Sequence, residues 1–194
     1  MPRFVSSTDP AEIERAEKYV LRSNDVEIDN EGYQTIAICE YFNIDKVDPF
    51  LSGRVVLKVS NEFYNREMKD KSPVHIEQCT ETETTSEGNA YIYGQEFKQG
   101  YVWVGDHLND AGNTSIFNVT KGLPTSEKVE QMMKMIDNEY DNIEKIKQVR
   151  EVVPEVLYIG STLNGDVGAS VFIHTNEAGE LDGLVISSFE VVDE

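Results

Sequence analysis

The residues best suited to chemistry lie in the segment Asp106-His107-Leu108-Asn109-Asp110, which is expected to form a loop after an aromatic strand. An aspartate beside a histidine can act in general acid–base catalysis, and Asp110 could add a carboxylate ligand for a metal ion. No serine or cysteine nucleophile stands in a recognisable turn nearby in the sequence. Asp106, His107 and Asp110 are therefore weak catalytic candidates, and a solvated hairpin loop is the simpler interpretation.

The other two histidines do not follow the pattern of a metal site. His75 and His174 fall in expected strands, and apart from Glu77 neither has an acidic or cysteine neighbour at metal-ligand spacing. A zinc site needs three or four ligands, so we predict no bound metal and a structural role for both histidines. The sequence also lacks phosphate-loop, dinucleotide, Cys-x-x-Cys and His-Glu-x-x-His motifs, so we predict no cofactor.

Acidic residues dominate the chain and are densest towards its C-terminal end. The 194 residues include 36 Asp or Glu and 17 Lys or Arg, which gives a formal charge of −19. Residues 151–194 contain nine of these acids and no lysine or arginine, and so supply nearly half of the net charge. We predict that seven of them form a surface that binds a partner: Asp166, Glu177, Glu180, Asp182, Glu190, Asp193 and Glu194.

This charge argues against direct binding to nucleic acid, because phosphate contacts require clustered lysine or arginine. Repulsion between negative charges likewise argues against binding to an anionic membrane surface. No apolar run approaches the ~18 residues that span a bilayer. The sequence shows no signal-peptide pattern, and its two cysteines indicate a reducing compartment. We therefore expect a cytoplasmic protein, in a host cell or a virion if it is viral, whose partner is a basic protein surface or an assembly neighbour.

A short helix near the N-terminus is the first element expected to support these residues. Asp9-Pro10-Ala11-Glu12 is typical of a helix start, because Asp9 can cap, proline suits the first turn and Glu12 completes a capping box. Apolar residues at near-helical spacing continue the helix to about Ser23-Asn24.

A second, longer helix is predicted over about residues 125–150. Apolar residues recur at steps of mostly three or four from Val129 to Val149, which indicates one continuous apolar face. Charged residues occupy the opposite face, and Pro154 ends the helix.

The rest of the chain is typical of strands joined by short turns, which implies mainly antiparallel pairing. The predicted fold class is α+β, with about 8–10 strands in mainly antiparallel sheets packed on the long helix, plus the short N-terminal helix. We expect residues 1–194 to form a single domain in which two sub-sheets clasp the long helix. A subdivision near Gly122 is the alternative.

The function that these patterns favour is a non-catalytic acidic interaction protein that docks on a basic partner. It would be an inhibitor that mimics nucleic acid towards a host DNA- or RNA-binding protein, of viral or mobile-element type, or a subunit of an assembly such as a virion. One alternative is a small hydrolase or metal-assisted enzyme using the Asp106–Asp110 loop. Another is a small-molecule-binding module with a pocket between the sheet and the long helix. Solubility alone would also explain the acidity.

Overall fold

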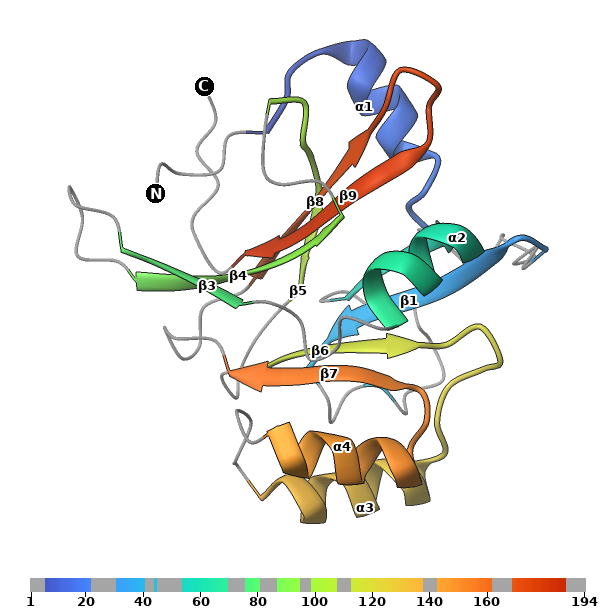
Figure 1. Cartoon of the computed structure of the whole chain (residues 1–194), viewed down its shortest axis with the longest axis vertical. Coiled ribbons are helices and arrows are strands. Elements are labelled where there is room, and N and C mark those ends of the chain that lie inside the picture. Colours follow the sequence, from blue (N-terminus) through green and yellow to red (C-terminus); the bar gives the residue numbers. More distant parts are fainter. Residues whose placement is uncertain are drawn as a thin grey trace.

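Two antiparallel sheets face each other at the centre of the molecule, with helices packed around them (Figure 1). The computed structural model describes residues 6–21, 31–40, 44, 54–69, 76–80, 87–94, 99–107, 113–137, 143–161 and 169–187. In chain order the elements are α1 (Pro10–Glu17), β1 (Tyr33–Cys39), β2 (Val55–Ser60), α2 (Asn61–Phe63), the π-helical segment η2 (Tyr64–Lys69), β3 (Ile76–Thr80), β4 (Glu87–Gly94), β5 (Val102–His107), β6 (Asn113–Asn118), α3 (Ser126–Ile136), α4 (Ile143–Val152), β7 (Val156–Ser161), β8 (Ala169–Thr175) and β9 (Leu181–Ser187).

The predicted α+β class with antiparallel sheets is confirmed. One sheet has the strand order β2-β1-β6-β7, and the other has the order β3-β4-β9-β8-β5. Every strand pairing within the described ranges is antiparallel. The β8–β9 hairpin and its neighbour β4 form the middle of the five-stranded sheet, so the C-terminal strands stabilise a layer begun much earlier in the chain.

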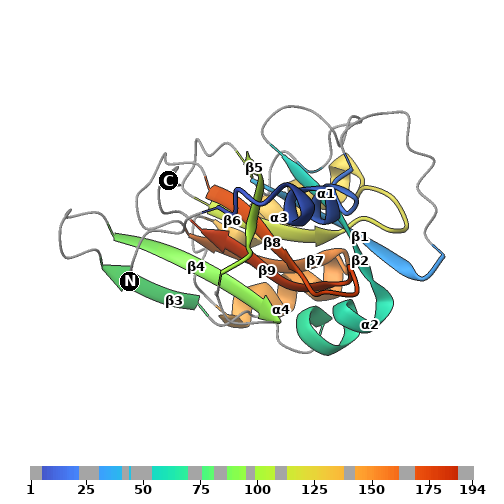
Figure 2. The same cartoon turned by 90° about the horizontal axis from the view of Figure 1, so that it is seen from above.

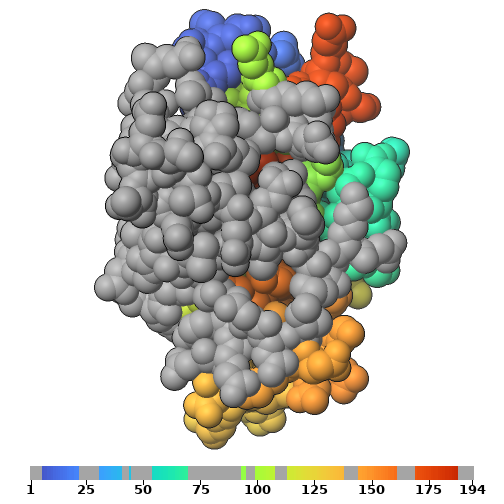
Figure 3. Space-filling model, turned by 60° about the vertical axis from the view of Figure 1, so that its left-hand side comes forward, coloured from blue at the N-terminus to red at the C-terminus, as the bar shows by residue number. Residues whose placement is uncertain are grey.

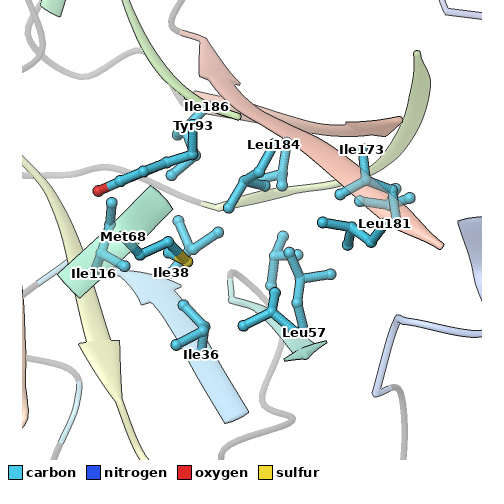
Figure 4. Close-up of a cluster of buried hydrophobic side chains, with 14 of the residues drawn as sticks. Ile36, Ile38, Leu57, Met68, Tyr93, Ile116, Ile173, Leu181, Leu184 and Ile186 are labelled. Carbon is cyan, nitrogen blue, oxygen red and sulfur yellow. The ribbon is translucent and has the colours of Figure 1, made fainter. Parts of the chain in front are cut away.

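The main hydrophobic core lies between the two sheets. Figure 4 shows Ile36, Ile38, Leu57 and Ile116 from one sheet facing Ile173, Leu184 and Ile186 from the other. Strand β1 is buried on both of its faces, because Ile36 and Ile38 point into this core while Ala37 and Cys39 point towards the helices. Alternating sides is the normal geometry of a strand, so a strand at the centre of a layered fold needs apolar residues throughout.

The prediction of one continuous helix over residues 125–150 is wrong. Helix α3 ends at Asp137, whose φ of 43° and ψ of 50° place it in the left-handed region, and α4 begins at Ile143. A straight 25-residue helix would be ~37 Å long, whereas the strands beneath it span only ~20 Å. Two shorter helices cover the same sheet more completely than one long helix would.

The expectation that two sheets clasp a helix is also wrong. Helices α3 and α4 contact each other and lie on the outer face of the β2-β1-β6-β7 sheet. Val129, Met132 and Ile136 of α3 are buried there against Ala37 and Phe117. The sheets therefore enclose one core between them, and the helices enclose a second core against one sheet.

Helix α1 begins as predicted and ends earlier than predicted. Asp9 is the N-cap, and its side chain accepts a hydrogen bond from the Ala11 N–H at 2.9 Å. The helix ends at Glu17 rather than near Ser23, because the next residues run beside β2 and the Leu21 N–H donates to the Val56 carbonyl at 2.9 Å. Seen from above, α1 lies beside β5 and β8 (Figure 2).

Candidate functional site

The structure places Asp106 and His107 in strand β5 rather than in the expected loop. Asp106 is exposed, and its carboxylate accepts hydrogen bonds from Trp103 Nε1 at 2.8 Å and from Ser170 Oγ at 2.6 Å. His107 is completely buried on the opposite face of the strand. The two side chains therefore point away from each other. Asp110, the third member of this candidate group, lies outside the described residues.

A cleft of about 390 Å³ opens at the other end of the two sheets, where β1 and β9 begin. It lies between the tip of the β8–β9 hairpin and the segment formed by α2 and η2, which Figure 3 shows on the same side of the molecule. The polar side chains of its lining are three carboxylates, one guanidinium group, two phenols, one aliphatic hydroxyl and one amide: Glu62, Glu180, Asp182, Arg66, Tyr19, Tyr33, Ser60 and Asn176. We call this the acidic cleft.

One wall of the acidic cleft is built by the turn that follows β2. Ser60 caps α2 by accepting a hydrogen bond from the Phe63 N–H at 3.1 Å, a common N-cap arrangement. The helical start places Arg66 one turn after Glu62, and their side chains pair at 3.1 Å. Arg66 also pairs with Glu67 at 3.0 Å. Arg66, the cationic residue among the described residues that line the cleft, is therefore already paired with carboxylates of its own segment.

The two tyrosines provide aromatic surface at the cleft. The Tyr19 hydroxyl donates to the Gly179 carbonyl at 2.5 Å and so ties the end of α1 to the β8–β9 turn. Burial raises the pKa of Tyr19, which keeps this hydroxyl protonated as a donor. The Lys58 ammonium lies 5.0 Å from the centroid of the Tyr33 ring, a cation–π contact within the chain itself.

The opposite wall is the β8–β9 hairpin, whose turn lies between Thr175 and Leu181. Asn176 holds this turn, because its side-chain oxygen accepts from the Glu180 N–H at 3.0 Å and its amide donates to the Glu180 carboxylate at 3.3 Å. Glu180 and Asp182 are two residues apart and both line the cleft. Glu177 is exposed at the tip of the same hairpin.

Besides lining the cleft, Asp182 forms a hydrogen bond that the sequence patterns did not reveal. Its Oδ1 lies 2.5 Å from His174 Nδ1, across the hairpin. The strand register shifts here, since His174 pairs with Gly183 while the next residue, Thr175, pairs with Leu181. Asp182 is the extra residue of this bulge. The glycine at position 179, typical of a turn between two strands, was the signal in the sequence that could have brought His174 and Asp182 together.

The structure brings three of the seven predicted surface acids onto one hairpin. Across the described ranges, neither Glu180 nor Asp182 pairs with a lysine or arginine. The other four predicted acids lie outside the described residues: Asp166, Glu190, Asp193 and Glu194. Within the described part of the chain, no group of three His, Cys, Asp or Glu side chains could hold a metal ion.

The chain is similar to a viral protein. It is 25% identical over 162 residues to Uncharacterized protein R816 of Acanthamoeba polyphaga mimivirus, which covers 79% of this chain and 76% of that protein. No family model matches the chain, and no solved structure matches it. Among the described residues, no helix is both long and apolar enough to cross a membrane.

The acidic cleft has the chemistry to bind a cation. It combines three carboxylates with a single, already paired guanidinium group, and aromatic rings lie among them. Carboxylates attract ammonium and guanidinium groups. Aromatic faces attract them too, and the ring of Tyr33 already makes such a contact with Lys58 of the same chain. A lysine or arginine side chain is the size of group that a cleft of about 390 Å³ could enclose.

Proposed function

We propose that this protein is a non-catalytic interaction protein of viral type, which docks on a basic partner by enclosing lysine or arginine side chains in the acidic cleft. The partner would be a basic protein of the host, which the protein inhibits by mimicking nucleic acid, or a basic neighbour in an assembly such as a virion. The similarity to a mimivirus protein supports the viral setting. The net charge of −19 supports a basic partner.

The observation that carries this proposal is the pair of carboxylates on the β8–β9 hairpin. Glu180 and Asp182 lie on one wall of the cleft, and no described lysine or arginine neutralises either of them. Each carboxylate has one oxygen held by a neighbour, since Asn176 donates to Glu180 and His174 is bonded to Asp182. Within the described residues nothing is bonded to the second oxygen of either carboxylate, which would meet the cation of a partner.

The two alternative functions have less support from the described residues. Asp106 and His107 lie on opposite faces of β5, which does not favour an active site built on that pair. The interface between α3 and the sheet is filled by Val129, Met132 and Ile136, so it offers little room for a small molecule there.

Direct binding of an oligoarginine peptide to the full chain tests the proposal. At ~50 mM salt we expect the double variant Glu180→Gln/Asp182→Asn to bind about tenfold more weakly than the unmodified protein, because two of the three cleft carboxylates are lost. The matched control is Glu127→Gln/Glu151→Gln on α3 and α4. These exposed residues carry the same charge and lie outside the cleft, and neither forms an ion pair with a lysine or arginine of the described residues.

The control variant separates the cleft from the overall charge. It should bind the peptide within about twofold of the unmodified protein, and an oligoglutamate peptide should not bind at all. Raising the salt from ~50 to ~500 mM should weaken oligoarginine binding sharply. Equal loss of affinity in both double variants, or binding that salt does not change, would refute docking through the cleft.

A further inference from the structure

His174 lies between Asp182, a residue of the acidic cleft, and the Glu12 side chain of helix α1. Its Nδ1 is bonded to Asp182, which lines the cleft. Its Nε2 points towards Gly100, where an added Cβ atom would lie 3.2 Å from this nitrogen and 3.3 Å from Glu12 Oε1. The imidazole therefore has a carboxylate directly bonded at one nitrogen and a second carboxylate close to the other.

The groups that face His174 come from every element around it. Strand β9 contributes Asp182, and α1 contributes Glu12, whose carboxylate also accepts a hydrogen bond from the Ser7 hydroxyl. The Tyr101 ring lies 5.2 Å from the imidazole, centroid to centroid, and burial raises the pKa of Tyr101 so that its phenol stays neutral. Among the described residues, Arg15 is a cation close to this group, and its Nε donates a hydrogen bond to the hydroxyl of Thr175, the neighbour of His174, at 3.4 Å.

We propose that His174 makes binding at the acidic cleft depend on pH, so that the protein releases a cationic partner when His174 becomes protonated. This inference rests on the proposed function, since it assigns a regulating residue to the same site. Neutral His174 donates its Nδ1 hydrogen to Asp182 and leaves the negative charge of that carboxylate available to the cleft. Protonated His174 carries a positive charge of its own and neutralises Asp182.

The direction of the effect follows from the charges around the cleft. Histidine is the side chain that ordinarily changes charge between about pH 5 and 8, whereas exposed carboxylates stay ionised in that range. As the pH falls, the cleft gains one positive charge beside Asp182 and loses part of its attraction for lysine or arginine. By the reciprocity of linked equilibria, a bound cation must in turn make His174 harder to protonate.

The test measures oligoarginine binding to the full chain at low salt between about pH 8 and about pH 5.5. We expect affinity to fall about fivefold over this range in the unmodified protein, as one of three cleft carboxylates is neutralised. In His174→Asn the amide can still donate to Asp182 but cannot titrate, so affinity should change by less than about twofold. His75→Asn, a histidine of the sequence outside the described residues, should keep the full pH dependence.

A second measurement needs no variant. The NMR signal of the His174 ring gives the pH at which half of this residue is protonated, and adding oligoarginine should shift that midpoint to lower pH. A purely structural histidine would show no such shift. The proposal is overturned if His174→Asn loses affinity at low pH as the unmodified protein does, or if the peptide leaves the midpoint unchanged.

The failures of the two proposals can be told apart. If the unmodified protein binds no oligoarginine at any pH, docking through the acidic cleft is itself wrong. If it binds tightly and equally at every pH, and Glu180→Gln/Asp182→Asn weakens it, the cleft is correct and the role of His174 is wrong.

Discussion

His107 and Thr114 connect the two sheets through a hydrogen bond of 2.9 Å between the imidazole Nε2 and the threonine hydroxyl. His107 lies at the end of β5 in the five-stranded sheet, and Thr114 lies in β6 of the four-stranded sheet. Both side chains are completely buried. Loss of either partner should lower stability, because a buried polar atom that loses its hydrogen bond is costly.

Replacing Thr114 by valine keeps the shape of the side chain and removes the hydroxyl. We expect a loss of about 1–3 kcal/mol in the free energy of unfolding, since the bond to the buried His107 disappears. Urea unfolding followed by circular dichroism measures the change. Thr8→Val is the control, because Thr8 is exposed, and it should shift stability by less than about 0.5 kcal/mol. Similar values for both variants would show that the bond between the sheets contributes nothing.

Gly94 lies close to Asp182 and Phe63, two residues that line the acidic cleft. A Cβ atom at this position would lie 2.4 Å from the Asp182 carbonyl oxygen and 2.8 Å from Phe63, and the residue has a φ of +74°. We expect Gly94→Ala to lose more than ~3 kcal/mol of unfolding free energy, because overlap with backbone atoms adds to the cost of a positive φ.

A variant at Gly122 distinguishes the cost of atomic overlap from the cost of a positive φ. Its φ is +110°, but nothing lies within 4 Å of the added Cβ. Gly122→Ala should therefore lose only about 1 kcal/mol, the cost of the backbone conformation alone. Equal losses in the two alanine variants, measured by thermal unfolding, would mean that close packing under the cleft is unimportant.

Cys39 is a buried free thiol, and burial raises its pKa from the ordinary value of 9.0 to about 12. The nearby Arg54 opposes this shift, and Glu40 adds to it. In Cys79→Ser, where Cys39 is the remaining cysteine, we expect no reaction with a disulfide reagent at about pH 8 unless the protein unfolds, since the thiolate is the reactive form.

The same shift determines how stability depends on pH in the alkaline range. The unfolded chain releases the thiol proton near pH 9, while the folded protein holds it to about pH 12. The contribution of Cys39 to stability is therefore complete below pH 9 and is lost as the pH rises towards 12. Cys39→Ala should make unfolding less sensitive to pH in this window. An identical pH profile in both proteins would contradict the assignment.

Asp137 ends α3 in a left-handed conformation, and its N–H donates to the Met133 carbonyl at 3.2 Å. Glycine adopts this conformation without steric cost, so Asp137→Gly should stabilise the protein by about 0.5–1 kcal/mol. Asp137→Val should destabilise it, because a β-branched residue tolerates a positive φ poorly. Calorimetric unfolding of the three proteins should rank them in the order Gly, Asp, Val. The reverse order would indicate that the break after α3 depends on the aspartate carboxylate.

The sequence by itself determined those features that depend on neighbouring residues. Asp9 and Pro10 specify the start of α1, since capping needs only a side-chain oxygen and a preset φ. Alternating and β-branched residues identify the strands, and short turns between them make the pairing antiparallel. The acidity of the β8–β9 hairpin was likewise visible in Glu177, Glu180 and Asp182, because charge is a property of composition.

Tertiary structure alone decided the rest. The apolar pattern of Val129 to Val149 continues past Asp137, so the local sequence did not reveal that α3 ends there and that α4 is a separate helix on the same sheet. At the acidic cleft, the Tyr19 hydroxyl is bonded to Gly179 of the hairpin, 160 residues later in the chain. Local sequence patterns carry no information about contacts at this separation. The bond between His174 and Asp182 depends on one extra residue in β9, because a bulge changes which side chains meet across a hairpin.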